Sequence, residues 1–240
     1  MNQILVTKKL YITPEMKRKK KIYKFDFMIS IFLMLILVSL YIYAEFDRNK
    51  AEEVSQDILA NINVEDKSKD NTIIKNNVLI AVLDEDNNEQ ELNSEEPQFQ
   101  QTETGDIYTT VGKIEIPKLN LSYPILEGKT GSETETEALL KISPCKFWGP
   151  DMNEIGNYCI VGHNYRNSKF FSKVPTLENG DIIELTDLSG RKLKYKIYNK
   201  YVVDPTDVSC TSQKTDGKKE VTLITCTDDS KQRVVIKAKR

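Results

Sequence analysis

The segment VTLITCTDDSKQRVVIKAK, residues 221–239, contains the pattern that decides the fold. Two runs rich in β-branched residues, Val221–Thr225 and Arg233–Lys239, flank a short polar stretch. β-Branched residues favour the pleated backbone of a strand, and a polar stretch between two such runs predicts a turn or loop. We therefore expect two adjacent antiparallel strands, with Cys226 at the end of the first and Arg233 at the start of the second.

Short β-rich runs of the same kind extend back to about residue 107. Pro124 within one of them suggests an edge strand, because proline cannot donate to a ladder. One helical pattern covers Thr134–Ile142 and stops before a proline. The strands expected in this part are Gly112–Pro117, Leu121–Leu126, Asn157–Gly162, Asp181–Thr186 and Lys192–Val203. About seven or eight strands with turn signals between them favour an all-β fold, a small closed barrel.

The N-terminal part of the chain differs from this β-rich region. Basic residues gather between Lys17 and Lys24, and Phe27–Ala44 is an apolar stretch interrupted only by serines. A helix of that length covers about 27 Å, close to the hydrocarbon thickness of a bilayer. Basic residues that precede a span stay in the cytoplasm. We expect residues 1–24 to be a cytoplasmic N-terminus and residues 25–44 to be a transmembrane signal anchor.

A cleaved signal peptide is the competing interpretation of this apolar stretch. The apolar region of a signal peptide usually has about 7–15 residues and ends at a small-residue cleavage site. Here the stretch is longer, and it ends with Tyr41, Ile42 and Tyr43, which suit the membrane interface better than a cleavage site. We expect an uncleaved anchor in a single-pass protein of the cell membrane, with the rest of the chain extracellular.

Residues 45–106 are rich in acidic residues, asparagine and glutamine and poor in aromatic residues. Such a composition buries too little apolar surface to offset the entropy that ordering removes. We expect an acidic linker, or stalk, over 45–106 and a β-rich domain over 107–240. The formal net charge of −2 is near zero and gives no argument for binding to nucleic acid.

The β-rich region holds three residue types suited to acyl transfer. His163 is the single histidine of the chain and ends an expected strand, while Cys226 and Arg233 flank the last loop. A nearby imidazole and guanidinium favour the thiolate form of a cysteine. Histidine can move protons to and from an amine, and arginine can hold an oxyanion. Cys226 is therefore the candidate nucleophile, His163 the candidate proton shuttle and Arg233 the candidate oxyanion stabiliser.

The stretch Thr222-Leu-Ile-Thr-Cys226 matches the Thr-Leu-x-Thr-Cys signature of the sortase family, and Val161-Gly-His163 resembles the strand end that carries the family's histidine. Arg233 stands where the family's arginine is expected, and the resemblance covers roughly residues 107–240. It implies an eight-stranded β-barrel with short helices and a cysteine transpeptidase of Gram-positive bacteria. It also implies that Thr225 helps to position substrate or to support the oxyanion, and that Cys226 alone of the four cysteines is catalytic.

The same resemblance implies a reaction and its partners. The enzyme would cleave a C-terminal Leu-Pro-x-Thr-Gly-like (LPxTG-like) sorting signal of surface proteins after threonine, through a thioacyl intermediate on Cys226. An amine of a peptidoglycan precursor, or a pilin lysine, would then receive the acyl group. No cofactor is expected, and a calcium site of the kind known in some sortases is not assignable. The sequence ends at Arg240, soon after the last expected strand, which suggests the type with a single N-terminal anchor; the subclass is left open.

Two other interpretations of the same residues stay open. Cysteines at 145, 159, 210 and 226 of an exported region can form two disulfides, so the region could be a disulfide-stapled β-barrel that binds a partner without catalysis. That interpretation requires an oxidised Cys226, whereas a nucleophile has to be a free thiol. A metal site built from Cys159, His163 and other cysteines is less favoured, because the spacing matches no zinc pattern.

Overall fold

The computed structural model describes residues 14–62, 99–102 and 105–240. The chain forms two compact units, Met1–Asn49 and Lys50–Arg240, each of which is considered by itself.

Helix α1 runs from Pro14 to Asn61 and contains the whole apolar stretch 27–44, whose side chains are largely exposed. Among the described residues it is the one helix long and apolar enough to cross a membrane. A signal sequence near an N-terminus passes the same test, so the anchor and its topology stay predictions. The helix continues through residues 45–61, the first part of the predicted linker. Residues 63–98 of that linker lie outside the described residues.

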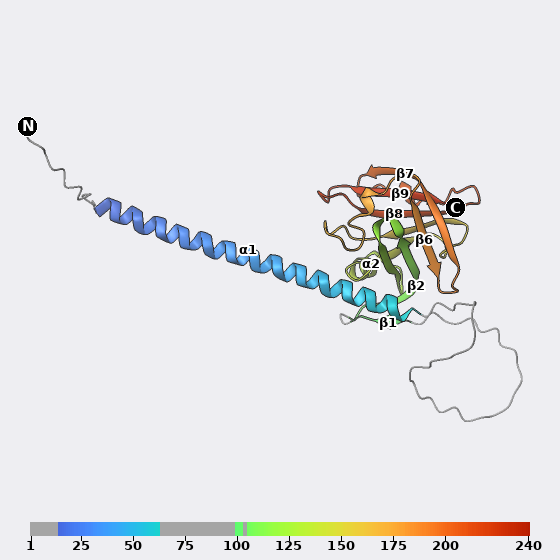
Figure 1. Ribbon diagram of the computed structural model, residues 1–240, viewed down its shortest axis with the longest axis horizontal. Helices are drawn as coiled ribbons and strands as arrows, with labels where there is room; N and C mark the ends of the chain where they lie inside the picture. Colours follow the sequence, from blue (N-terminus) through green and yellow to red (C-terminus); the bar gives the residue numbers. More distant parts are fainter. Residues whose placement is uncertain (1–13, 63–98, 103–104) are drawn as a thin grey trace, which may run out of the picture. The chain divides into compact units, whose positions relative to one another are not determined.

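The second unit contains the β-strands. They are β1 (Gln100–Gln101), β2 (Ile107–Ile116), β3 (Leu121–Gly128), β4 (Cys145–Trp148), β5 (Gly156–Val161), β6 (Ile182–Asp187), β7 (Lys192–Val203), β8 (Lys219–Cys226) and β9 (Arg233–Lys239). Eight of them follow the order β2-β3-β4-β5-β8-β9-β7-β6, and pairing of β6 with β2 closes the barrel (Figure 1). Short β1 extends the sheet beyond β2. The predicted closed β-barrel of about eight strands is confirmed.

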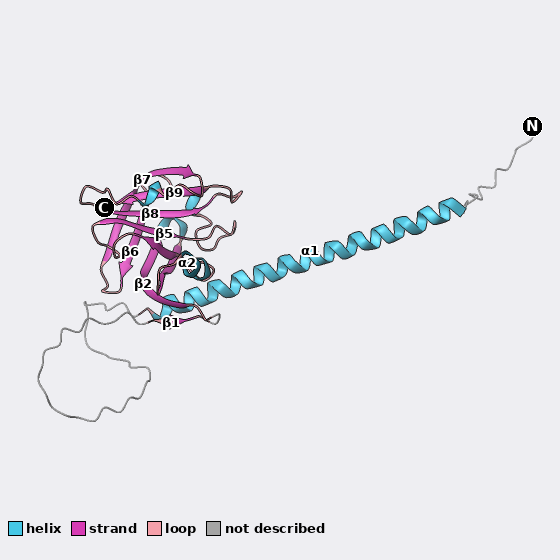
Figure 2. Cartoon of the chain, turned by 180° about the vertical axis from the view of Figure 1, so that it is seen from behind, coloured by secondary structure: helices cyan, strands magenta, loops and turns pink. Residues whose placement is uncertain are grey.

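Short helices accompany the barrel, as predicted. Helix α2 (Glu133–Leu139) is capped by Ser132, whose hydroxyl accepts a hydrogen bond from the backbone N–H of Glu135. The helix lies outside the barrel (Figure 2). The 3₁₀ turns are η1 (Pro117–Leu119), η2 (Val174–Thr176) and η3 (Ser209–Thr211). The strands β1 and β4 were missed by the sequence analysis, because two and four residues are too few for a periodic signal.

Pro124 lies within β3, which pairs with β2 along its length and with β4 through the single pair Leu126–Cys145. The prediction of an edge strand was therefore wrong for β3 as a whole. Pro124 nevertheless lies where the β4 side offers no ladder partner. Its carbonyl instead accepts a hydrogen bond of 2.7 Å from Ser143 Oγ, so the polar group is satisfied away from the ladder.

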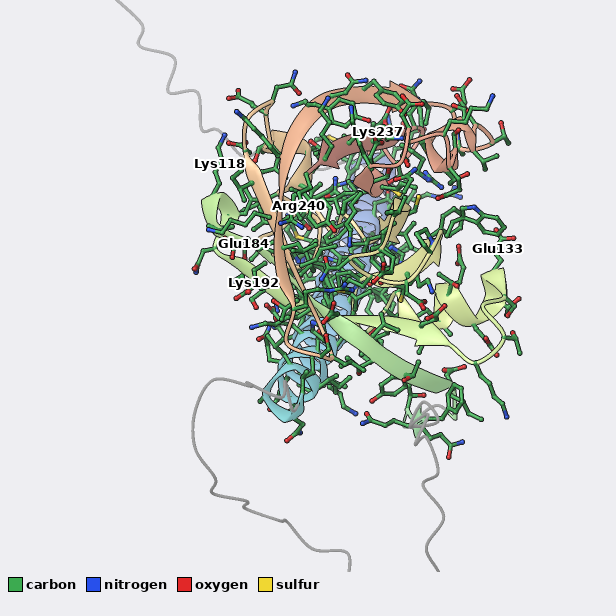
Figure 3. The ribbon with its side chains drawn as sticks, turned by 90° about the vertical axis from the view of Figure 1, so that its right-hand side faces the viewer. Lys118, Glu133, Glu184, Lys192, Lys237 and Arg240 are labelled. Carbon is green, nitrogen blue, oxygen red and sulfur yellow. The ribbon has the colours of Figure 1, made fainter. Side chains whose placement is uncertain are left out.

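Alternation along the strands determines which side chains fill the barrel. Val221 and Leu223 of β8 and Val234 and Ile236 of β9 belong to the main core. Because successive strand residues point to opposite faces, Ile224 of β8 and Val235 of β9 face outward, where they form a separate cluster with Cys210. Charged residues also lie outside: Figure 3 shows Glu184 of β6 beside Lys192 of β7, with Oε2 and Nζ 2.5 Å apart.

Gly162, directly after β5, provides the first test of this packing. A Cβ atom there would lie 2.5 Å from Cγ and Cδ2 of the buried Phe171 ring. We expect Gly162→Ala to lower the free energy of unfolding by about 1–3 kcal/mol, the usual cost of overpacking. Urea denaturation of the purified protein measures this loss. The loss should shrink when Phe171→Leu removes the ring; an equal loss in both backgrounds would contradict the steric explanation.

Candidate active site

Cys226 and Arg233 are brought together by the antiparallel pairing of β8 with β9. The two residues are direct partners at the end of this ladder, so their Cβ atoms lie about 4.5–5.5 Å apart on one face. That face is the outer one, since the preceding pair in the ladder, Thr225 and Val234, is buried and faces inward. Both side chains are half-buried, which leaves the thiol and the guanidinium accessible at the rim of the barrel.

His163 reaches the same rim because β5 runs parallel to β8. The register pairs Val161 with Ile224, and the N–H of Gly162 continues it by donating to the carbonyl of Ile224 at 3.1 Å. Two residues after Val161 the chain reaches His163, and two residues after Ile224 it reaches Cys226. Since parallel neighbours lie about 4.8 Å apart, the register brings the imidazole-bearing and thiol-bearing residues to adjacent positions. The three predicted site residues are thus gathered from the loop after β5, the end of β8 and the start of β9.

Thr225 lies below this rim and not on it. Its side chain is buried, and its hydroxyl donates a hydrogen bond of 2.8 Å to the carbonyl of Gly162. The bond ties β8 to the residue that precedes His163. Thr225 therefore faces away from Cys226, and its geometry suits positioning of the two strand ends.

Asn164 is a site residue that the sequence analysis did not identify as functional. Its side-chain amide donates to the carbonyl of Cys226 and to Oδ1 of Asp228, both at 3.0 Å. Its own Oδ1 accepts from the backbone N–H of Arg166 at 2.9 Å. The amide thereby joins the loop after His163 to the loop after Cys226. Only its position next to the histidine hinted at this role, because the partners lie more than sixty residues away.

The environment of His163 favours its neutral form. Burial lowers its pKa below the ordinary value of 6.5. The charges of Lys141 and Arg233 act in the same direction, and Glu137 opposes them. The ring also contacts Tyr165, with ring centroids 5.1 Å apart. A neutral imidazole at pH 7 can accept a proton from a thiol or an incoming amine.

The loop that follows His163 is fixed to it by packing and hydrogen bonding. The N–H of Phe171 donates to the carbonyl of His163 at 3.1 Å, and the Phe171 ring lies against Gly162. The hydroxyl of Ser172 accepts from the N–H of Tyr165 at 2.9 Å. The loop therefore folds back on its starting point, and the N–H of Phe171 holds the backbone of His163.

All four cysteines are free in the structure, and they differ in burial. Cys145, Cys159 and Cys210 are buried, and burial raises the pKa of each thiol, that of Cys159 to about 12. A buried thiol of that kind stays protonated and unreactive. Cys226 is the cysteine with a partly exposed side chain. Within the described residues no group of three or more His, Cys, Asp and Glu side chains could hold a metal ion.

The chain resembles known proteins over the part that holds these residues. A family model described as a sortase domain matches residues 114–240, more than half of the chain. Sortase A of Bacillus anthracis is 33% identical over 132 residues, which are 52% of this chain and 57% of that protein. The chain thus spans little more than half the length of this relative.

The chain is also similar to solved structures. A sortase D5 transpeptidase of Clostridium perfringens is 32% identical, with a TM-score of 0.47, over 55% of this chain and 78% of that one. A lid mutant of sortase A from Corynebacterium diphtheriae is 25% identical, with a TM-score of 0.48, over 55% of this chain and 70% of that one. With its match to the family model over residues 114–240, the chain belongs to the sortase family.

Proposed function

We propose that the chain is a cysteine transpeptidase that joins surface proteins to an amine of the cell wall. The observation that carries the proposal is the meeting of His163, Cys226 and Arg233 at one rim through the β5–β8 and β8–β9 registers. Sortases are transpeptidases as a family, and the half-buried free thiol of Cys226 supports the same chemistry here.

Cys226 serves as nucleophile in the first half of the reaction. The Cys226 thiol gives its proton to His163, and the sulfur attacks the threonine carbonyl of an LPxTG-like sorting signal. The Thr–Gly amide bond then breaks, and the imidazolium returns its proton to the leaving amine. The products are a thioacyl enzyme on Cys226 and the released C-terminal fragment.

The second half reverses these steps with a new amine. His163 accepts a proton from the incoming amine, whose nitrogen attacks the thioester carbon. Collapse of the tetrahedral intermediate forms an amide bond and releases the Cys226 thiolate, which is reprotonated. The acceptor that we propose is an amine of a peptidoglycan precursor, with a pilin lysine as the alternative. The balance of bonds and protons needs no cofactor.

Arg233 stabilises the oxyanion of both tetrahedral intermediates. Its guanidinium is always charged and presents several donors in a plane, and cross-strand pairing holds it beside Cys226. Its hydrogen bond to the protein is a long one, 3.4 Å from Nη1 to the carbonyl of Gln232, so donors remain for a ligand. Thr225 contributes by holding the strand ends through Gly162 and thereby supports this arrangement.

The location that fits this reaction is the outer face of a cell membrane. We propose a cytoplasmic segment at 1–24, a single transmembrane anchor at 25–44, a linker within 45–106 and a catalytic domain at 107–240. The apolar stretch of α1 supports the anchor by its length and composition. Partners then comprise surface proteins with a sorting signal, the wall precursor and the membrane itself.

The non-catalytic alternative, a disulfide-stapled binding module, has less support. It needs an oxidised Cys226, whereas the structure leaves all four cysteines free. It also gives no reason for a histidine and an arginine to meet at the one partly exposed thiol.

The transpeptidase proposal is tested with a quenched peptide carrying an LPxTG-like site. We expect cleavage after threonine that accelerates when an amine is added, because aminolysis of the thioester competes with hydrolysis. Cys226→Ala should reduce the rate to background, while Cys210→Ala should retain cleavage. A product analysis by mass spectrometry identifies the bond that breaks. Undiminished cleavage by Cys226→Ala would remove the nucleophile assignment.

The oxyanion role of Arg233 predicts a sensitivity to shape as well as to charge. Arg233→Lys keeps the charge but loses the planar fork, and we expect kcat to fall by about 10²-fold, as when one oxyanion donor is lost. Steady-state kinetics on the same peptide measure the effect. Arg240→Lys is the matched control, since Arg240 is exposed beyond β9. Near-normal kcat in Arg233→Lys would exclude the role.

The lowered pKa of His163 predicts a pH dependence of stability. Between its folded pKa and about 6.5 the unfolded chain binds more protons than the folded one, so stability increases with pH through that window. The contribution of His163 to the free energy of unfolding is complete above about pH 6.5. It is lost as pH falls through the pKa of His163 in the folded state. Urea denaturation at pH 7.5 and pH 5 should therefore show a larger loss for the wild-type protein than for His163→Gln. Equal losses would contradict the buried neutral histidine.

A further inference from the structure

The C-terminal end of α1 is packed onto the barrel as a part of the second unit. Ala51 contacts the main core, and Ile58 contacts the smaller cluster around Leu126 and Leu139. Ser55 between them is fully buried and donates to Ser143 Oγ at 3.0 Å. Residues 50–61 therefore behave as an element of the domain, although their composition predicts a linker.

Glu52 of this element connects it to the loop that follows His163. Its Oε2 lies 2.7 Å from Nζ of Lys169, which belongs to that loop. Its Oε1 accepts a hydrogen bond of 3.0 Å from the hydroxyl of Tyr123 on β3. Both charged side chains are largely shielded, with 16% of Lys169 and 28% of Glu52 exposed, so the pair is less screened than a surface ion pair.

Tyr123 passes this connection on to Phe170. The hydroxyl that donates to Glu52 also accepts the N–H of Phe170 at 3.0 Å. Burial raises the pKa of Tyr123 to about 12, so the phenol keeps the proton that it donates. The rings of Tyr123 and Phe170 stack with centroids 5.2 Å apart.

Phe170 needs such support because its backbone is strained. Its φ is +48°, in the left-handed region that a bulky residue rarely adopts. Strain of this kind costs on the order of 1–3 kcal/mol and persists only where the surroundings enforce it. The hydrogen bond and the stacking from Tyr123 enforce this conformation here. The edge-on ring of Tyr165, whose centroid lies 5.6 Å from that of Phe170, adds to them.

The strained residue directly precedes the contact that holds the histidine backbone. Phe171 follows Phe170 directly, donates its N–H to the carbonyl of His163 and packs its ring on Gly162. We therefore expect a change at Phe170 to alter the backbone of the residue that carries the imidazole. The connection runs from Glu52 through Tyr123 and Phe170 to His163.

We propose that Glu52 is a positioning residue for His163, and that residues 50–61 of α1 are a brace for the catalytic loop 163–171. The inference deepens the proposed transpeptidase function and rests on it only for the effect on turnover. The bracing itself is a statement about the geometry of His163. Since α1 is one continuous helix, the same segment that holds the loop is covalently joined to the predicted anchor.

The test compares Glu52→Ala with Glu53→Ala in the full-length protein in detergent micelles. Glu53 is the exposed neighbour on the same helix, so both variants make the same change of residue and charge. His163 is the only histidine, so its imidazole gives one set of NMR signals whose pH titration reports its environment. The charged groups that act on it, Glu137, Lys141 and Arg233, are unchanged in both variants.

We expect Glu52→Ala to move the His163 titration midpoint upward, toward 6.5, because a loosened loop admits water. We also expect a tenfold to hundredfold fall in kcat/KM that is carried by kcat, as for a roughly 1 Å misplacement. Tyr123→Phe should act in the same direction, and the double variant should lose less than the sum of the two, as for residues in one network. Glu53→Ala should match the wild-type protein in both measurements.

Two results would overturn the bracing. One is a His163 titration that is identical in Glu52→Ala and Glu53→Ala. The other is a loss of thermal stability in Glu52→Ala with unchanged titration and unchanged kcat, which would leave Glu52 a purely structural role. If the wild-type protein cleaves no sorting-signal peptide, the transpeptidase proposal fails, and the titration still decides the bracing.

Discussion

The parallel register of β5 and β8 is the constraint on which the rest of the site depends. The hydrogen bond from Gly162 to Ile224 extends it past the end of β5, and two more residues lead to His163 and Cys226. A register slip of one residue would turn one of these side chains to the other face of the barrel. The antiparallel β8–β9 pairing then adds Arg233 on the same outer face. The three residues of the proposed chemistry are thus brought to one rim by main-chain hydrogen bonds, which are the most regular contacts in the fold.

The ends of strands are less well determined than their middles, and the site is reinforced there. Thr225 ties β8 to Gly162, and Asn164 ties the loop after His163 to the carbonyl of Cys226. The ring contacts of Phe170 with Tyr123 and Tyr165 also hold this loop. Burial also lowers the pKa of His163, because a charged imidazole would lose hydration.

Membership of the sortase family and the proposed bracing by α1 concern different parts of the chain. The family match begins at residue 114, whereas Glu52 and Ser55 lie well before it. The helix end contributes buried polar contacts to Ser143, Tyr123 and Lys169, all of them within the matched region. A segment outside the family's domain is in this way attached to the loop that carries the histidine.

The sequence by itself determined the closed β-barrel, the long apolar helix and the residues of the proposed chemistry, because strand alternation, apolar length and the Thr222–Cys226 signature are local patterns. It did not determine β4, the helical state of residues 45–61, or the roles of Asn164 and Glu52. Each of those depends on partners far away in the chain: Cys226 for Asn164, and Tyr123 and Lys169 for Glu52. Local composition marked residues 50–61 as poorly suited to ordering, and burial of Ser55 and Ala51 against the barrel reversed that expectation. Tertiary packing decided these features, since hydrogen bonds and burial between distant residues leave no periodic trace in the sequence.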